Sequence, residues 1–283
     1  MRRGHITHGV RDDDTDYTVV GLRLLEEHGK DVTSEQIARF WLKNIPYGKT
    51  YTAERAAYRN FVNDIWPSRS ARWHNPHREW IGAQIRADAW GYCCPGRLQA
   101  GAELAFRDAS ISHTRNGIYG AMWVAAMIAA AYVADDPEQV ISLGLSEIPG
   151  QCRLAEAINR VLSWYRDGVG AEEATGRLLD AFGDYHAVHS INNAAVVALG
   201  LLWGEGDFSR SIGLAVMAGL DTDCNGATVG SVAGVLLGES GLPARWVDPL
   251  NDRLETAVAG DASVRISDLA ARTLPFQAES IGH

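Results

Sequence analysis

The chain has 283 residues, with 26 Lys and Arg against 35 Asp and Glu, so its formal charge is −9. This acidic balance argues against a nucleic-acid partner, because affinity for the phosphate backbone comes mainly from Lys and Arg. The 46% of hydrophobic residues excludes a disordered protein, and four cysteines are too few for a disulfide scaffold. We therefore expect a globular protein with a large core in a reducing, cytoplasmic compartment.

The sequence contains no recognisable targeting or membrane-spanning segment. Residues 1–14 are basic at their start but lack the apolar stretch of a signal peptide. The longest apolar run, 121–134, is about 14 residues long and falls short of the roughly 20 that cross a bilayer. We expect this run to form a buried core helix, and we expect no membrane partner.

Apolar periodicity indicates helices along nearly the whole chain, the first over 16–28. Thr33 and Gln36 have the spacing of a capping box, so a second helix should begin there. It should end near Asn44, because Pro46 disfavours a helical conformation at the residue before it. Further helices are predicted over 52–63, 78–90, 97–110 and 115–134. The stretch 66–80 is the longest without periodicity, and is either a functional loop or an irregular surface segment.

The second half of the chain continues the helical pattern. Asp136 followed by Pro137 is a helix start signal, an N-cap aspartate before a proline at the first helical position. The predicted helices are 137–146, 152–167, 171–182, 188–203, 208–219 and 225–238. Because we find no strand pattern, repeat or linker, we predict a single all-α domain over 1–283.

The last of these helices carries glycines at every fourth position, which places them on one face. Glycine costs about 1 kcal/mol per helical position relative to alanine, so the stripe indicates a packing demand. We expect a tightly packed core helix over 230–238.

Two acidic clusters stand directly before apolar helices. The first is Asp12, Asp13 and Asp14, with Asp16 close behind. Acidic residues are favoured in a first helical turn, and capping alone would account for one or two of them. Three consecutive carboxylates repel one another unless a positive charge is present.

The second cluster is Asp221, Asp223 and Cys224, between a glycine turn and the glycine-striped helix. We expect its carboxylates to be partly buried, and unpaired buried carboxylates are costly. A hard divalent cation shared by the two clusters would compensate both, because Mg²⁺ and Mn²⁺ prefer oxygen ligands.

The first motif, DDDTDYT, followed about 200 residues later by GLDTDCNGATVGSVAGVLLG, resembles the ADP-ribosylglycohydrolases, which include the dinitrogenase-reductase-activating glycohydrolases. The resemblance covers about residues 12 to 240. It implies a compact orthogonal helical bundle with a binuclear Mg²⁺ or Mn²⁺ centre. Asp13 and Asp14 match the early metal ligands of the family, and Asp12 stands where Thr or Ser is usual. Asp221 and Asp223 match the late ligands, and Cys224 stands where Thr or Ser is usual.

The resemblance extends to the middle of the chain. Residues 82–86, GAQIR, look like a divergent form of the family's loop that contacts ribose and diphosphate, which assigns Gly82, Ala83 and Gln84 to the substrate. Ser112-His113-Thr114 resembles the Thr-His segment that opens a central helix, so His113 is either structural or lines the pocket.

Three features of the sequence depart from the family pattern. The family's opening Gly-Asp-x-x-Gly segment, which often bears an acidic residue near the metals, is expected to be missing here. Cys224 is a poor ligand for a hard cation. The loop 82–86 lacks the usual additional glycine. Without the opening segment, Asp16 or Asp12 is the available proton relay.

Several other residues have two interpretations. The pair His186 and His189 forms either half a zinc site or, as we prefer, polar residues at a helix start. Cys93-Cys94 before a proline indicates a turn. Asn192 and Asn193 line the metal pocket or begin a buried helix. The aromatic residues crowding one region form a stacking wall for a ring or, by default, pack in the core: Tyr51, Tyr58, Trp66, Trp73, Trp80 and Trp90.

The resemblance implies a metal-dependent hydrolase that cleaves a ribosyl glycosidic bond, with an ADP-ribosylated protein or a small ribosyl compound as its partner. Asp13, Asp14 and Asp223 would carry the reaction, with Asp16 as the proton relay. A hydrolase of a small N-glycoside and a non-catalytic ADP-ribose-binding protein are the alternatives.

Overall fold

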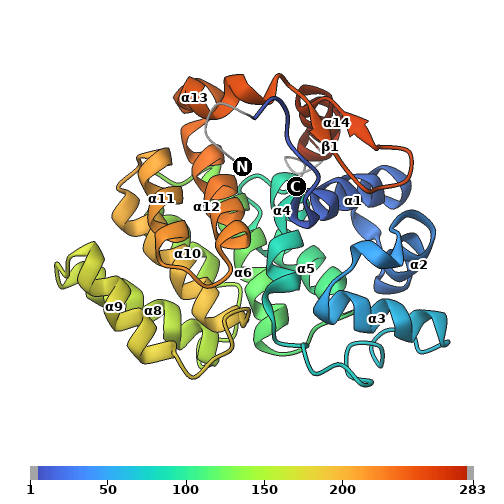
Figure 1. The fold of residues 1–283 in the computed structure, drawn as a ribbon, viewed down its shortest axis with the longest axis horizontal. Helices are drawn as coiled ribbons and strands as arrows, with labels where there is room; N and C mark the ends of the chain where they lie inside the picture. The colour runs from blue at the N-terminus through green and yellow to red at the C-terminus, as the bar shows by residue number, and fades with distance from the viewer. Residues whose placement is uncertain (1–5, 279–283) are drawn as a thin grey trace.

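The computed structural model describes residues 6–278 and is almost entirely helical (Figure 1). The described part holds one short antiparallel hairpin, β1 Leu254–Glu255 with β2 Ser263–Val264. The prediction of an all-α fold is confirmed. The two ends of the predicted domain, 1–5 and 279–283, lie outside the described residues.

The α-helices follow one another with short connections. Their bounds are α1 Asp13–His28, α2 Ser34–Asn44, α3 Thr52–Val62, α4 Asp88–Tyr92, α5 Leu98–Ala109, α6 Asn116–Ala131, α7 Pro137–Leu145, α8 Arg153–Arg166, α9 Ala171–Phe182, α10 Ser190–Gly204, α11 Phe208–Met217, α12 Thr222–Leu237, α13 Ala244–Val247 and α14 Ile266–Ala278.

Two apolar helices, α6 and α10, form the centre of the core. Every residue of α10 is buried, as is nearly all of α6, so neither has a polar face. Helices α4, α5 and α7 pack against α6, and helices α8, α9, α11 and α12 pack against α10. Figure 1 shows α1–α3 on one side of the molecule and α8–α12 on the other. Within residues 6–278, no helix has the length and apolarity needed to cross a membrane.

The helix start signals seen in the sequence are confirmed. The backbone N–H of Gln36 donates to Thr33 Oγ1 at 3.3 Å. The backbone N–H of Thr33 donates to Gln36 Oε1 at 2.8 Å, which completes the capping box of α2. Asp136 Oδ1 accepts from the Gln139 amide at 2.9 Å at the start of α7. Local side-chain chemistry therefore determines where these helices begin.

The predicted helix over 78–90 is wrong. Residues 66–80 are mostly turns, the 3₁₀ helix η3 covers Ile81–Arg86, and α4 begins only at Asp88. All six residues of η3 are buried, and the guanidinium of Arg86 donates back to the Gly82 carbonyl at 3.3 Å. Tertiary burial of a charged side chain thus overrides the local periodicity.

The expectation of tight packing at the glycines of 230–238 is wrong, because the one close approach is at Gly226, before that range. A Cβ on Gly226 or Gly230 would lie 3.3 Å from Val216 and 3.6 Å from Ile212 of α11. A Cβ on Gly234 or Gly238 would meet nothing within 4 Å. Gly238 instead ends the helix with φ +65°, a conformation that glycine adopts without strain.

Candidate metal centre

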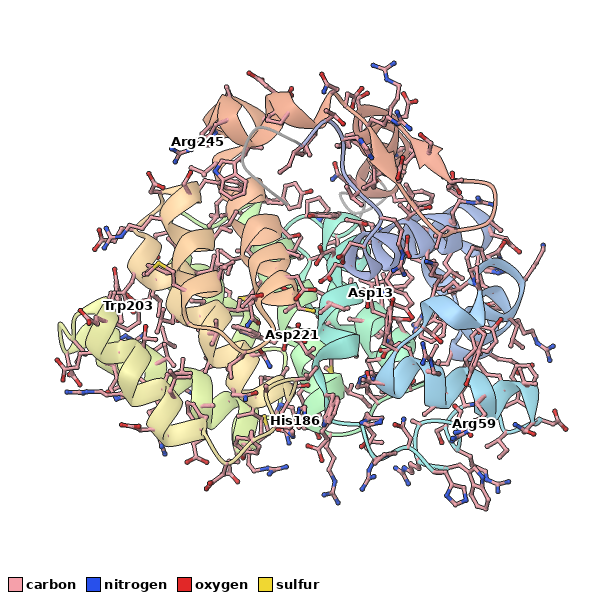
Figure 2. All side chains as sticks on the ribbon, in the orientation of Figure 1. Asp13, Arg59, His186, Trp203, Asp221 and Arg245 are labelled. Carbon is pink, nitrogen blue, oxygen red and sulfur yellow. The ribbon has the colours of Figure 1, made fainter. Side chains whose placement is uncertain are left out.

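The two acidic motifs lie at the first turns of α1 and α12, which meet in the middle of the molecule. Figure 2 shows Asp13 and Asp221 there. Asp12 is the N-cap of α1, and its Oδ1 accepts from the Asp14 amide at 3.0 Å. One carboxylate therefore meets the capping need, so that Asp13 and Asp14 are available for another role.

A turn in the left-handed backbone conformation directly precedes the second motif. Gly219 and Leu220 both have positive φ, +82° and +62°, and for a leucine this conformation is strained. Asn193 of α10 fixes the turn, because its Oδ1 accepts from the Asp221 amide at 3.1 Å and from Asn225 Nδ2 at 2.8 Å. Asn193 was expected to line the pocket or begin a helix, and its bond to the Asp221 amide could not be predicted because the two residues are far apart in sequence.

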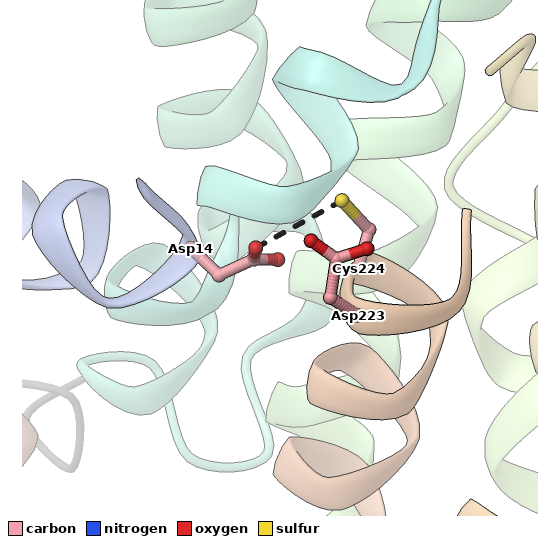
Figure 3. A group of neighbouring side chains, drawn as sticks. All are labelled: Asp14, Asp223 and Cys224. Atoms are coloured by element: carbon pink, nitrogen blue, oxygen red, sulfur yellow. Dashed lines mark hydrogen bonds between the residues drawn. The ribbon is translucent and has the colours of Figure 1, made fainter. Parts of the chain in front are cut away.

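Ligand atoms from both motifs come within reach of one another. One potential ligand atom from each of Asp14, Asp223 and Cys224 lies within 4.8 Å of the others (Figure 3). The same holds for Asp12, Asp13 and Asp14. Asp14 belongs to both groups. Its side chain is buried, and its Oδ1 has no hydrogen-bond partner.

The carboxylates raise one another's pKa. Burial raises the pKa of Asp14 well above its usual value, and its neighbours Asp12, Asp13 and Asp223 raise it further. The pKa of Asp13 is raised by burial and by Asp12. The pKa of Asp221 rises to about 6, mainly through burial and also through Asp223 and Asp13. The site concentrates negative charge with no cationic side chain among its members.

The residues present fit a hard divalent cation. Carboxylate oxygens are the ligands that Mg²⁺ and Mn²⁺ prefer, and the orphaned Oδ1 of Asp14 is a buried acceptor that a cation would satisfy. Two helix N-termini also point at the site, although their partial charges are worth only about 1 kcal/mol each. A divalent cation would relieve the repulsion described above.

Cys224 lies in the site as a thiol. Its Sγ is 3.8 Å from Asp14 Oδ2, the contact drawn in Figure 3. Burial raises the pKa of this thiol, and Asp14 and Asp221 raise it further. The sulfur therefore keeps its proton and donates it to Asp14, and a protonated thiol is a poor ligand for a hard cation.

Asp16 points away from the centre towards the C-terminal segment. Its Oδ2 accepts from Arg11 Nε at 2.7 Å, and its Oδ1 accepts from the Ala257 amide at 2.8 Å. Both oxygens thus have structural partners, which leaves Asp16 poorly suited to the proton relay that we expected of it.

The residues assigned to the substrate or to the pocket are all buried. Gly82, Ala83 and Gln84 form part of η3 in the interior, and both polar atoms of the Gln84 amide lack a partner. His113 is 1% exposed, and its Nδ1 lies 2.8 Å from Ser112 Oγ. Asn192 donates to the His186 carbonyl at 3.0 Å and lines a small pocket of about 210 Å³.

The two histidines and the six aromatic residues lie in different parts of the structure. His189 is the N-cap of α10 and accepts from the Ile191 amide at 3.2 Å, as expected for a helix-start residue. The ring of His186 stacks on Trp80 with centroids 4.3 Å apart. The six aromatic residues do not form one wall, since Trp90 is in the core and Trp73 is 48% exposed. Cys93 and Cys94 lie in the predicted turn.

Comparisons with known proteins agree with this geometry. The model of the ADP-ribosylglycohydrolase family matches residues 3–274. Among solved structures, an "ADP-ribosylglycohydrolase-related protein complex" is similar in fold, with a TM-score of 0.67 at 19% sequence identity over 95% of this chain and 82% of that one. No curated protein sequence matches the chain significantly. The chain belongs to the ADP-ribosylglycohydrolase family and is a glycosidase, a hydrolase of glycosidic bonds.

Proposed function

We propose that the protein is a divalent-metal-dependent hydrolase that cleaves the glycosidic bond at the ribose of an ADP-ribosylated substrate. The observation that carries the proposal is the convergence of two acidic motifs on Asp14, whose buried Oδ1 has no partner. Family membership supports the reaction class, and the acidic cluster supports the metal dependence.

In this proposal the carboxylates of both motifs hold two Mg²⁺ or Mn²⁺ ions, one at each group of ligand atoms. The metal would supply Lewis acidity and lower the pKa of water. The chain's own contribution is to orient the carboxylates: Asn193 fixes the start of α12, and the Asp12 cap fixes the start of α1. The ligands would be Asp12, Asp13, Asp14, Asp221 and Asp223.

A small N-glycoside is the second candidate substrate. The observation in its favour is that η3, assigned by resemblance to ribose and diphosphate, is buried, with Ala83 and Gln84 at 0% exposure. A loop in this position offers a diphosphate few accessible contacts, so a smaller substrate would lose less there. A binding protein without turnover is the third alternative.

Release of ADP-ribose from an ADP-ribosylated protein, followed by chromatography, tests the proposal. We expect the wild type to release it with Mg²⁺ and to stop after chelation. We expect the double variant Asp221→Asn and Asp223→Asn to be at least about 100-fold slower. Full activity of that variant, or no effect of the chelator, would contradict the proposal. Turnover of small ribosides alone would favour the second candidate, and no turnover of either would favour the third.

A further inference from the structure

A group of charged side chains is buried between α3, η3 and α5. Arg86 of η3 donates from Nη1 to Glu54 Oε1 at 2.6 Å and from Nε to Asp108 Oδ2 at 2.6 Å. The side chains of these three residues are at most 5% exposed. Ion pairs this deep are costly to desolvate and are kept only where their geometry is well satisfied.

The two carboxylates of this cluster are held differently. Asp108 is bound to Arg86 through both its side chain and its carbonyl, which accepts from Arg86 Nη2 at 3.0 Å. Arg86 holds Glu54 through Oε1, and Glu54 Oε2 accepts only a long hydrogen bond from Thr52 Oγ1 at 3.5 Å. Glu54 therefore has one fixed oxygen and one oxygen with only a weak partner.

The cluster carries one negative charge more than its single arginine balances. His113, whose Nε2 is 3.8 Å from Glu54 Oε1, does not supply the missing positive charge. Burial lowers its pKa well below the usual value, and the charge of Arg86 lowers it further, so this imidazole is neutral. A proton on Glu54 would restore the balance.

The cluster lies next to α1, the helix whose first turn carries Asp13 and Asp14. Tyr17 follows Asp13 by one helical turn, so both lie on the same face of α1. The Tyr17 ring is 5.8 Å from the guanidinium of Arg86, which holds Glu54. The carboxylate of Glu54 also lies directly against η3, since a Cβ on Gly82 would be 2.3 Å from Glu54 Oε1.

The other buried carboxylates of residues 6–278 differ from Glu54 in their surroundings. Asp14 belongs to the metal centre, Asp16 is held by Arg11, and Asp108 is held by Arg86. Within this part of the chain, no hydrogen bond or ion pair joins the remaining two to this cluster. Asp88 accepts from Ser231 through Oδ2 and has no partner at Oδ1, and Asp261 pairs with Arg23 and Arg272.

We propose that Glu54 is the proton donor of this site and that Arg86 positions it. In the reaction, the electron pair of the bond between the ribose C1″ and the leaving group goes to the leaving group, which takes the proton of Glu54. Water then adds its oxygen to C1″, and its released proton returns to the Glu54 carboxylate. Bonds and protons balance without a further reactant, and Glu54 replaces Asp16 and Asp12 as the proton relay.

The environment of Glu54 supports this role. Burial raises the pKa of Glu54 to about 7 against the opposing charge of Arg86, and Asp13 adds to the rise. A carboxyl group with a pKa near neutrality holds its proton at working pH and can still release it. At the start of α3, Thr52 has φ +34°, a strained conformation for a β-branched residue and a feature that clusters at functional sites.

The test compares two ribosyl conjugates in the presence of Mg²⁺. A conjugate of 4-nitrophenol leaves as a stable anion, whereas a conjugate of an alkylguanidine must be protonated as it leaves. We expect Glu54→Gln, which keeps an acceptor for Arg86, to slow the guanidine conjugate by about 100-fold or more in kcat and the nitrophenol conjugate by less than about 10-fold. The matched control is Asp88→Asn, another buried carboxylate whose pKa is raised to about 7, and we expect it to keep both rates.

The inference rests on the proposed function, and the two can fail separately. If the wild type hydrolyses neither conjugate, the proposed function and the inference both fail. If the wild type is active and Glu54→Gln keeps its rate on the guanidine conjugate, only the inference fails. If both conjugates slow equally while the melting temperature or calorimetric Mg²⁺ affinity falls, Glu54 is structural and the inference is wrong.

Discussion

At the scale of the residue, the central feature is a set of carboxylates whose charges are uncompensated in the protein alone. The pKa values of Asp13 and Asp14 are raised by burial and by their acidic neighbours, and that of Asp221 is raised to about 6. Each raised pKa means that the folded state binds protons more tightly than the unfolded state, where the pKa of aspartate is about 3.9. Protons and a metal cation would therefore compete for the same carboxylates.

This competition predicts the pH dependence of stability. Without metal, these carboxylates stabilise the fold fully below about pH 4, and the contribution is lost as the pH rises through about 6. We expect the melting temperature of chelated protein to fall between pH 5 and pH 8, and Mg²⁺ to raise it most at pH 8, where protons compete least. Thermal denaturation with chelator or Mg²⁺ measures this.

Asp14→Asn is the control for that measurement. It should remove most of the difference between the chelated and the Mg²⁺-containing samples. An unchanged difference in this variant, or a Mg²⁺ effect that is largest at pH 5, would contradict the electrostatic account.

At the scale of the element, side-chain hydrogen bonds set where the important helices begin. The starts of α2 and α7 could be predicted because their caps are local in sequence, as at Thr33 and Asp136. The 3₁₀ segment η3 could not, because it depends on Arg86 pairing with Glu54 and Asp108 from distant helices. Helix α14 was also missed, because it contains Pro275, and a proline inside a segment argues against a helix there.

The start of α12 depends on Asn193 of α10. This side chain is fully buried, its Oδ1 accepts from both Asp221 and Asn225, and its Nδ2 donates to two carbonyls. We expect Asn193→Ala to lower the free energy of unfolding by about 2–4 kcal/mol, because it leaves buried polar groups unpaired. Urea denaturation measures this loss.

Asn63→Ala is the matched control for Asn193→Ala, since Asn63 makes one exposed hydrogen bond to the Arg59 carbonyl at 2.7 Å. We expect it to change stability by less than about 0.5 kcal/mol. Asn193→Ala should also weaken Mg²⁺ binding, because it frees the turn that carries Asp221. Equal stability losses in the two variants would show that the hydrogen bonds of Asn193 do not fix the start of α12.

At the scale of the whole molecule, the fold brings two motifs about 200 residues apart to one place. The sequence supported the all-α fold and both acidic motifs, because periodicity and clustered charge are visible in a linear chain. It did not reveal Glu54, which looks like an ordinary acidic residue in a first helical turn and becomes unusual only when α3, η3 and α5 bury it. The burial of residues 82–84 could not be predicted from the sequence either, because it depends on how η3 packs against α6.

Part of the net charge of −9 is concentrated at one place, because the two motifs of the candidate metal centre hold five of the acidic residues, Asp12, Asp13, Asp14, Asp221 and Asp223. Two divalent cations would offset most of that local charge. The protein should therefore bind cations in proportion to these carboxylates, and not through its acidic surface in general.

The central claim is tested most directly by calorimetric titration of Mg²⁺ into chelator-treated protein, with the wild type and Asp14→Asn measured side by side. The account predicts binding of about two ions to the wild type and the loss of at least one of them in Asp14→Asn, which removes the carboxylate common to both groups. The account is contradicted if the wild type binds no Mg²⁺, or if both proteins bind it with the same stoichiometry and affinity.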